Sequence, residues 1–368
     1  MIKTRAIAFY LPQFYPTPEN DKWWSPGFTE WTNVARSKPL FPGHYQPRIP
    51  RDFGFYDLRV PETREKQAQL AREAGIEGFC YWHYWFNGKR LLSEVFKEVV
   101  ETGKPDFPFC LCWANHSWYA KTWDPNKPNK LLIEQTYKGV EDYTAHFYEM
   151  LSAFKDERYM KVDGKLIFGI FDTDMFPDTK LFIDVWNNLA TKNGLNGFYF
   201  FGFAPGQKRY RKTMPKGFDT VVYDCLVDIA LKYIDTKPSL ISRVLMKLRK
   251  NGYLHYTDYE DYVKRAINIF SNNKDCTPCI NPDFDHSPRS SDKGIILHKS
   301  TPARWRRLLE ATIDIVRNKE NSNNLLFIKS WNEWGEGNYL EPDLRYGKQY
   351  IEETAKALNK GNTDFNNT

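Results

Sequence analysis

The segment Leu325-Leu-Phe-Ile-Lys-Ser330 runs straight into Trp331-Asn-Glu-Trp-Gly-Glu-Gly337. A short, nearly continuous apolar run predicts a buried strand. Carboxyl and aromatic residues directly after such a strand are typical of the active-site end of a (β/α)8 barrel. This pairing therefore predicts an α/β barrel that carries its chemistry after its last strand.

Seven further apolar runs precede this segment, and helical patterns lie between most of them. The runs are Ala6–Leu11, Gly78–Trp85, Phe107–Trp113, Lys165–Phe171, Gly197–Phe203, Phe218–Tyr223 and the weaker Cys276–Asn281. The helical patterns are Pro61–Ala74, Leu91–Thr102, Asp142–Phe154, Thr179–Lys192, Thr301–Arg317 and Gly347–Leu358. Eight such strands predict a single (β/α)8, or TIM, barrel. A doubly wound open sheet is the alternative, and the count of eight disfavours it.

We expect one catalytic domain over residues 1–360 and a flexible tail at 361–368. A long loop rich in Pro and Trp follows the first strand, and a helical insertion at 226–275 follows the sixth. Within that insertion, residues 240–250 combine an apolar helical face with basic side chains. Such a helix either packs on the barrel or makes weak peripheral contact with an anionic membrane.

Composition narrows the classes of partner. Aromatic residues make up 16% of the chain, with 12 Trp, and sugar-binding sites use flat rings of this kind. The net charge of +6 comes without a zinc finger, a basic reading helix or a phosphate loop, so no nucleic acid partner is expected. No run approaches the ~20 apolar residues of a membrane span. Without a recognisable signal peptide, a cytoplasmic location is expected.

The six cysteines predict neither a metal site nor a redox site. Cys80, Cys110 and Cys112 sit inside apolar runs and resemble small core residues. The spacing Cys276-Thr-Pro-Cys279 has no second CxxC pair. We therefore expect no metal and no cofactor.

Polar and aromatic residues gather where the predicted strands end, which indicates a cleft that binds a polyol. Glu333 and Glu336 are the candidate catalytic pair, because glycosidic bond cleavage needs two carboxyl groups in unlike environments. A solvated surface turn is the alternative for this spacing, and His83 and His116 could equally be ordinary buried histidines. The expected substrate-binding residues are Tyr10, Gln13, Glu30, Trp31, Tyr81, Trp82, His83, Tyr84, Trp113, Asn115, His116, Trp118, Asp285, Trp331, Asn332 and Trp334.

Several motifs resemble the WbsX-like proteins of bacterial polysaccharide loci, which are related to glycoside hydrolase family 99, the endo-α-mannosidases. They are Phe9-Tyr-Leu-Pro-Gln-Phe-Tyr-Pro16, Gly27-Phe-Thr-Glu-Trp-Thr-Asn-Val34, Gly78-Phe-Cys-Tyr-Trp82, Trp113-Ala-Asn115 and Trp331-Asn-Glu-Trp-Gly-Glu-Gly337. The resemblance implies a retaining mechanism without metal. In it, Glu333 takes the proton of the sugar 2-hydroxyl to give an epoxide-like intermediate, and Glu336 acts as general acid and then as base.

One departure from that pattern concerns His116 in Trp113-Ala-Asn-His-Ser-Trp118, where many WbsX-like proteins have a glutamate. This change leaves the sugar specificity open. The leading hypothesis is an endo-acting glycoside hydrolase on a bacterial surface polysaccharide or its precursor. A biosynthetic glycosyltransferase or transglycosylase in O-antigen or capsule assembly is the second hypothesis. A carbohydrate-binding protein without catalysis is the third.

Overall fold

The computed structural model describes residues 3–120, 128–235, 255–319 and 323–363. The segment 240–250, considered above for membrane contact, lies outside these ranges. Within them, no helix is both long and apolar enough to cross a membrane.

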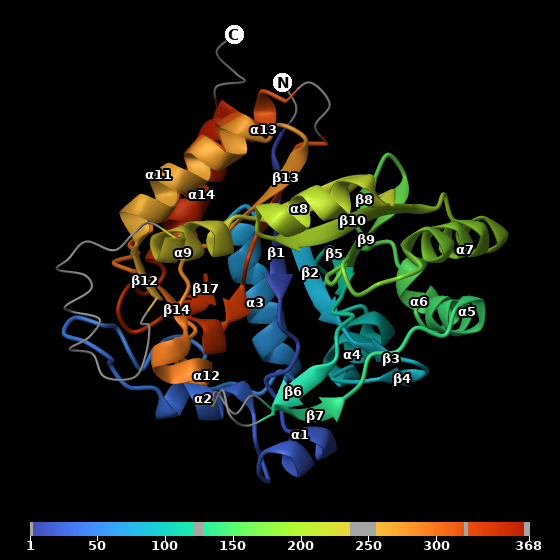
Figure 1. Cartoon of the computed structure of the whole chain (residues 1–368), viewed down its shortest axis with the longest axis horizontal. Helices are drawn as coiled ribbons and strands as arrows, with labels where there is room; N and C mark the ends of the chain where they lie inside the picture. The colour runs from blue at the N-terminus through green and yellow to red at the C-terminus, as the bar shows by residue number, and fades with distance from the viewer. Residues whose placement is uncertain (1–2, 121–127, 236–254, 320–322, 364–368) are drawn as a thin grey trace.

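Eight parallel strands form a closed barrel, so the expected (β/α)8 fold is confirmed and the doubly wound sheet is excluded (Figure 1). Strand β1 pairs with β2 on one side and β15 on the other, and β9 pairs with β10 to complete the ring. Every apolar run predicted from the sequence is a barrel strand. The strands are β1 (Arg5–Tyr10), β2 (Gly78–His83), β5 (Phe109–Trp113), β9 (Lys165–Ile170), β10 (Phe198–Pro205), β11 (Thr220–Asp224), β13 (Cys276–Ile280) and β15 (Leu325–Ile328).

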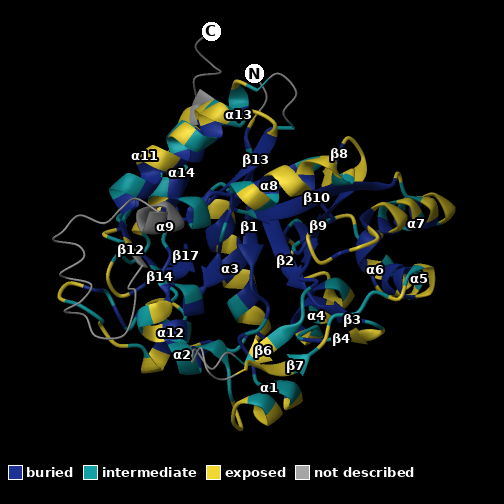
Figure 2. Ribbon diagram, in the orientation of Figure 1, coloured by how far each residue is buried: buried dark blue, intermediate teal, exposed yellow. Residues whose placement is uncertain are grey.

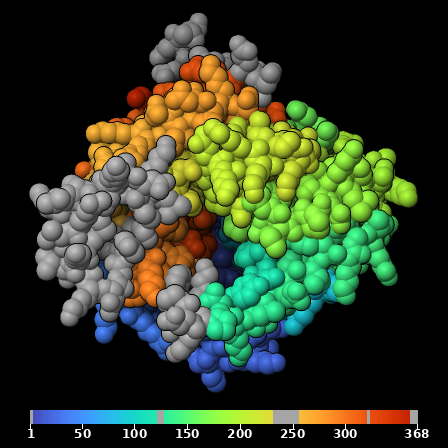
Figure 3. All heavy atoms as spheres, viewed as in Figure 1, coloured from blue at the N-terminus to red at the C-terminus, as the bar shows by residue number. Residues whose placement is uncertain are grey.

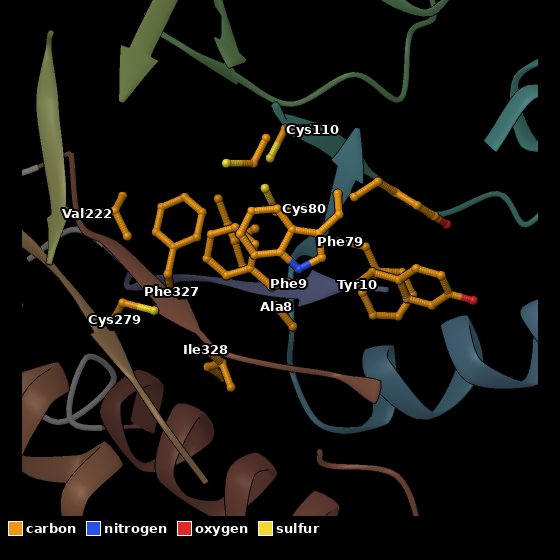
Figure 4. Close-up of a cluster of buried hydrophobic side chains, with 14 of the residues drawn as sticks. Ala8, Phe9, Tyr10, Phe79, Cys80, Cys110, Val222, Cys279, Phe327 and Ile328 are labelled. Carbon is orange, nitrogen blue, oxygen red and sulfur yellow. The ribbon is translucent and has the colours of Figure 1, made fainter. Parts of the chain in front are cut away.

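Aromatic side chains fill the barrel interior. The ring of Phe9 stacks on Trp82 at 4.6 Å between centroids and meets the edge of Phe203 at 5.6 Å. Figure 4 shows Phe9, Cys80 and Phe327 directed at one another from three strands. The described cysteines are all free and buried, as expected of small core residues. Successive residues of a strand point to opposite faces, so every second residue leaves this interior and packs under the helices.

Helices surround the barrel and expose only their outer faces (Figure 2). Helix α13 begins as its sequence predicts: the Thr301 side chain accepts from the Arg304 amide at 3.3 Å, and Pro302 opens the first turn. The covering helices are α3 (Pro61–Glu73), α4 (Glu94–Thr102), α5 (Val140–Glu149), α6 (Leu151–Phe154), α7 (Thr179–Lys192), α8 (Gln207–Thr213), α11 (Tyr259–Asn272), α13 (Pro302–Arg317) and α14 (Gln349–Thr363). Helix α14 continues past the predicted end at Leu358, into the predicted tail, and residues 364–368 lie outside the described ranges.

The insertion after the sixth strand contains helix α9 (Leu226–Asp235), strand β12 (His255–Asp258) and helix α11. Helix α11 packs against α13, so it is the barrel helix that precedes β13. Strand β12 pairs in parallel with β14 (Ile295–His298), a strand that sequence analysis did not predict.

Short elements lie between the barrel strands and the covering helices, many of them after the carboxyl ends of the strands. They are α1 (Pro18–Trp23), α2 (Glu30–Arg36), β3 (Trp85–Phe86), β4 (Lys89–Arg90), β6 (Trp118–Ala120), β7 (Lys130–Ile133), β8 (Lys161–Val162), η1 (Met214–Lys216), α12 (Ser287–Ser290), η2 (Ser291–Lys293), β16 (Asn332–Glu333), η3 (Trp334–Glu336) and β17 (Asn338–Tyr339). Helices α1 and α2 both lie in the long loop between β1 and α3.

Candidate active site

A cleft with a volume of about 550 Å³ opens where the barrel strands end. Figure 3 shows the molecule hollowed on this face. The structure brings together eight of the residues predicted from sequence around this cleft. They are Gln13, Glu30, Trp82, Tyr84, His116, Trp118, Glu333 and Glu336.

Four predicted residues lie on barrel strands but point away from the cleft. The Tyr10 hydroxyl donates to Gln67 of α3 at 2.7 Å, and Tyr81 packs on Phe96 of α4. Figure 4 shows Tyr10 on the opposite side of its strand from the barrel interior. Nε2 of His83 is hydrogen-bonded to Nε2 of His146, and the Trp113 indole donates to the Trp85 carbonyl. These side chains occupy the alternate strand positions, which face the helices.

Six further predicted residues contact protein groups instead of lining the cleft. The Asn332 side chain bonds the amide and carbonyl of Leu11 and joins the first strand to the last. Asp285, which is fully buried, accepts from His44 and Gln46. The remaining four donate hydrogen bonds from side-chain nitrogens. Asn115 donates to the Asp172 carbonyl and the Tyr137 hydroxyl, Trp31 donates to the Tyr56 carbonyl, and Trp331 and Trp334 donate to the Glu341 carboxylate.

The candidate catalytic residues lie on a small hairpin. Strands β16 and β17 pair antiparallel, and the 3-10 turn η3 joins them. Gly337 has φ +55°, a conformation that glycine adopts at little cost. Gly335 serves a different purpose: a side-chain carbon there would overlap the carboxylate of Glu30 and lie 3.0 Å from Nε of Arg289.

Arg289 of α12 joins three carboxylates across the cleft. Its Nη1 donates to Glu336 at 2.7 Å, its Nη2 to Glu333 at 2.7 Å and its Nε to Glu30 at 3.0 Å. One planar guanidinium therefore fixes the convergence of the two candidate catalytic carboxyls. Neither of these carboxyls points to bulk solvent, so the hairpin is not a solvated surface turn.

The two catalytic candidates experience opposite electrostatic surroundings. Burial, together with the nearby charge of Glu336, raises the pKa of Glu333 to about 7. Burial alone would also raise the pKa of Glu336, but Lys329 and Arg289 outweigh it and lower that pKa to about 2. The ammonium of Lys329 lies 3.8 Å from Glu336. At neutral pH this arrangement holds one carboxyl partly protonated beside one that is ionised.

Sequence reasoning missed the cations of the cleft. Lys329 directly follows the apolar residues of β15, and a single lysine at the carboxyl end of a buried strand is a signal that could have identified it. In the sequence, Arg289 follows the apolar run of β13 without a recognisable helical pattern. Only its position after a barrel strand therefore indicated that it could line the cleft. His286, 4.0 Å from Glu336, lines the cleft as well.

Glu341 supports the hairpin from behind. Its carboxylate accepts from Gln67 at 2.6 Å, Tyr56 at 2.8 Å, Trp331 at 3.1 Å and Trp334 at 2.6 Å. Burial raises its pKa to about 7, although all four donors act to lower it. The tryptophans that flank Glu333 are thus held by a buried carboxyl that sequence analysis did not single out.

Comparison with solved structures agrees with the fold. The GH99 endo-alpha-mannosidase of Bacteroides thetaiotaomicron superimposes with a TM-score of 0.58 at 13% identity, and the alignment covers 100% of both chains. A structure named glycoside hydrolase-like protein gives a TM-score of 0.59 at 14% identity, over 97% of this chain and 94% of that one. These likenesses establish a shared barrel architecture.

Closer relatives come from sequence. WxcX of Xanthomonas campestris pv. campestris (strain ATCC 33913) is 35% identical over 360 residues, which are 96% of this chain and 49% of that protein. The WxcX of strain B100 is 35% identical over 358 residues with the same coverage. The chain thus spans about half the length of the curated relatives it matches. Residues 6–354 match the family described as Glycosyltransferase WbsX, and the chain belongs to that family.

Proposed function

We propose that this chain is a glycan-processing enzyme that acts on glycosidic bonds with Glu333 and Glu336. One observation carries the proposal: two buried carboxyls with pKa values of about 7 and about 2 converge on one guanidinium in an aromatic cleft. Cleavage needs a group that protonates the leaving oxygen and a second that acts at the anomeric side of the bond. Carboxyls whose pKa values are pushed apart can fill both roles at one pH.

The favoured form is retaining, endo-acting hydrolysis of a bacterial surface polysaccharide or its precursor. Trp23, Trp24 and Trp118 line the same cleft as the carboxyls, so more than one sugar has an aromatic surface to contact. Transfer to a sugar hydroxyl is the second candidate, and the family description as a glycosyltransferase favours it. Carbohydrate binding without catalysis is disfavoured because both carboxyls face the cleft.

The roles of the two carboxyls follow the resemblance as a hypothesis. Glu333 takes the proton of the 2-hydroxyl while O2 attacks C1, and Glu336 gives its proton to the departing oxygen as the C1–O bond breaks. Water or a sugar hydroxyl then attacks C1 and loses its proton to Glu336, while the C1–O2 bond breaks and O2 regains a proton from Glu333. Two inversions at C1 leave the configuration retained.

This order of events requires Glu336 to gain a proton when the sugar binds. In the free cleft, Lys329, Arg289 and His286 keep Glu336 ionised. The free cleft favours the opposite assignment, in which Glu333 holds the transferable proton. A sugar that displaces Arg289 from Glu336 removes one of the charges that keep it ionised.

A substrate with a good leaving group distinguishes the two assignments. We would first screen O-antigen and capsule polysaccharides with the wild-type chain, then prepare the glycosyl fluoride of the sugar that is released. Fluoride leaves with little help from an acid, so loss of the general acid costs little in kcat/KM on the fluoride, which reports the first step, but about 10²- to 10⁴-fold in kcat/KM on the polysaccharide. If Glu336 is the acid, Glu336→Gln shows this pattern and Glu333→Gln loses both activities.

The reverse pattern assigns the acid to Glu333. Product analysis in H₂¹⁸O separates hydrolysis from transfer, because only hydrolysis places the heavy oxygen at C1. Wild-type rates for both variants on the polysaccharide would overturn the proposal.

A further inference from the structure

A second cavity of about 350 Å³ lies behind the catalytic hairpin, and it shares no lining residue with the cleft. Four parts of the chain far apart in sequence form it: the loop around Tyr45, Asp283 after β13, the end of β14 with the residues that follow it, and the stretch from β17 into α14. Its volume falls at the lower end of the range of pockets that hold small ligands.

Tyrosines and cations meet at this cavity. The guanidinium of Arg345 lies 4.8 Å from the ring centre of Tyr45 and 5.2 Å from that of Tyr346. Contact with aromatic rings occupies the faces of a guanidinium and leaves the N–H donors at its edge available. Arg345 makes no hydrogen bond or ion pair with any residue in the described part of the chain, and its side chain is exposed.

The carboxylates of the cavity are already engaged. Asp283 accepts from Arg48 at 2.7 Å, and Asp343 accepts from the Tyr339 hydroxyl at 2.9 Å. The ammonium of Lys299 is exposed and lies 3.8 Å from its nearest acidic partner, Asp258. Arg345 therefore has no acidic partner in the described part of the chain, and Lys299 has only this long ion pair, so both can contact an anionic ligand.

We propose that this cavity binds a saccharide that carries an anionic group, with the anion on Arg345 and Lys299 and the sugar against the tyrosines. Carboxylate and phosphate oxygens both match the edge of a guanidinium. The saccharide part of this inference rests on the proposed function, whereas the anion part rests on the charges alone.

The cavity also contacts the support of the catalytic hairpin. Arg48 lines it, and the same Nη1 atom that bonds Asp283 donates to the carbonyl of Gly337 at 3.0 Å. Tyr339, which lines the cavity, belongs to strand β17 of the hairpin. A ligand bound here would therefore contact residues that hold the turn carrying Glu336.

The test is calorimetric titration of the full chain with glucuronic acid, glucose 1-phosphate, glucose and inorganic phosphate. We expect at least one acidic sugar to bind and glucose to bind at least about tenfold more weakly, a difference of ~1.4 kcal/mol. Preference for glucuronic acid identifies a carboxylate, and preference for glucose 1-phosphate identifies a phosphate. Arg345→Gln should weaken the preferred sugar by at least about tenfold.

Arg59→Gln is the matched control, because Arg59 also lies over a tyrosine, Tyr15, but has an acidic partner in Asp57. It should leave binding unchanged. Unchanged binding in Arg345→Gln, or no binding of either acidic sugar, overturns the inference. Inorganic phosphate that binds as tightly as glucose 1-phosphate overturns its saccharide part. Binding retained by a Glu333→Gln chain without turnover separates this site from the proposed function.

Discussion

Nη2 of Arg289 lies 2.7 Å from Oε1 of Glu333, yet the pKa of Glu333 is raised to about 7. A cation at this distance normally lowers the pKa of a carboxyl. Burial, Glu336 and Glu30 act in the opposite direction and outweigh it. Arg289 therefore holds three carboxylates together in the free cleft without ionising all of them.

Replacing this arginine should destabilise the fold and the cleft together. Arg289→Gln leaves Glu30, Glu333 and Glu336 facing one another without their shared cation. We expect the free energy of unfolding at about pH 8 to fall by about 2–4 kcal/mol, since breaking a largely buried ion pair leaves charge uncompensated. Urea unfolding measures this change.

Arg289→Lys is the companion variant. It keeps the charge but loses the planar guanidinium that bonds three carboxylates at once, so it should recover part of the stability and little of the activity. Equal activity of Arg289→Lys and wild type would show that charge alone suffices at this position.

The raised pKa of Glu333 makes stability depend on pH. Between the ordinary value of 4.5 and the folded value of about 7, the folded protein holds a proton that the unfolded chain has lost. Stability from the neutral carboxyl is therefore complete below 4.5 and is lost as the pH rises through 7. Glu333→Gln stays neutral, so it should raise the free energy of unfolding at about pH 8 by about 1–3 kcal/mol.

At about pH 4 the same variant should match the wild type, because Glu333 is then neutral in both folded and unfolded chains. Urea unfolding at a series of pH values measures the difference. Glu336→Gln is the contrasting variant, since the low pKa of Glu336 contributes stability that is lost only as the pH falls toward 2. A pH-independent effect of Glu333→Gln would contradict the raised pKa.

The sequence predicted the barrel well because buried parallel strands are almost wholly apolar and helices separate them. Its eight runs coincide with the eight strands, and Thr179–Lys192 matches helix α7. Helices α1 and α2 were not predicted, because long-range packing against the hairpin and α12, rather than an apolar period, holds α2 in place.

The site was harder to predict because strand residues alternate between the interior and the helices. Trp82 and His83 are adjacent in β2, yet Trp82 lines the cleft and His83 faces His146 of α5. Sequence analysis assigned both to the substrate. Sequence analysis did not identify Arg289 as a site residue, because its partners come from α2 and the hairpin, which only the folded chain brings together.

The buried carboxylate of Glu341 should stabilise the hairpin strongly, although Glu341 does not line the cleft. Glu341→Ala leaves four donors without their acceptor, among them the indole nitrogens of Trp331 and Trp334. Each unsatisfied buried donor costs about 1–3 kcal/mol, so we expect a loss of at least about 3 kcal/mol of stability. Thermal unfolding and tryptophan emission measure the loss and the exposure of the rings.

Tyr56→Phe is the control for Glu341, because it removes one of the four donors and leaves the carboxylate in place. It should cost about 1 kcal/mol. A Glu341→Ala chain as stable as Tyr56→Phe would mean that other groups hold the tryptophans.

Gly335 tests whether close packing against the hairpin orders the carboxylates. A methyl group at this position would overlap Glu30 and lie 3.0 Å from Nε of Arg289. Gly335→Ala should therefore push Glu30 away from Arg289 and lower turnover on the substrate identified by the polysaccharide screen. Because the overlap is with a side chain, shortening Glu30 should relieve it.

A double-mutant cycle separates this packing effect from a change in backbone. Gly335→Ala and Glu30→Ala are each expected to destabilise the fold, but the double variant should lose less than the sum of the two, by at least about 0.5 kcal/mol. If the two losses of stability are additive, the destabilisation by Gly335→Ala comes from the backbone of the turn and not from contact with Glu30. A positive coupling would instead identify glycine at 335 as the residue that lets Glu30 reach Arg289 and complete the set of three carboxylates around one guanidinium.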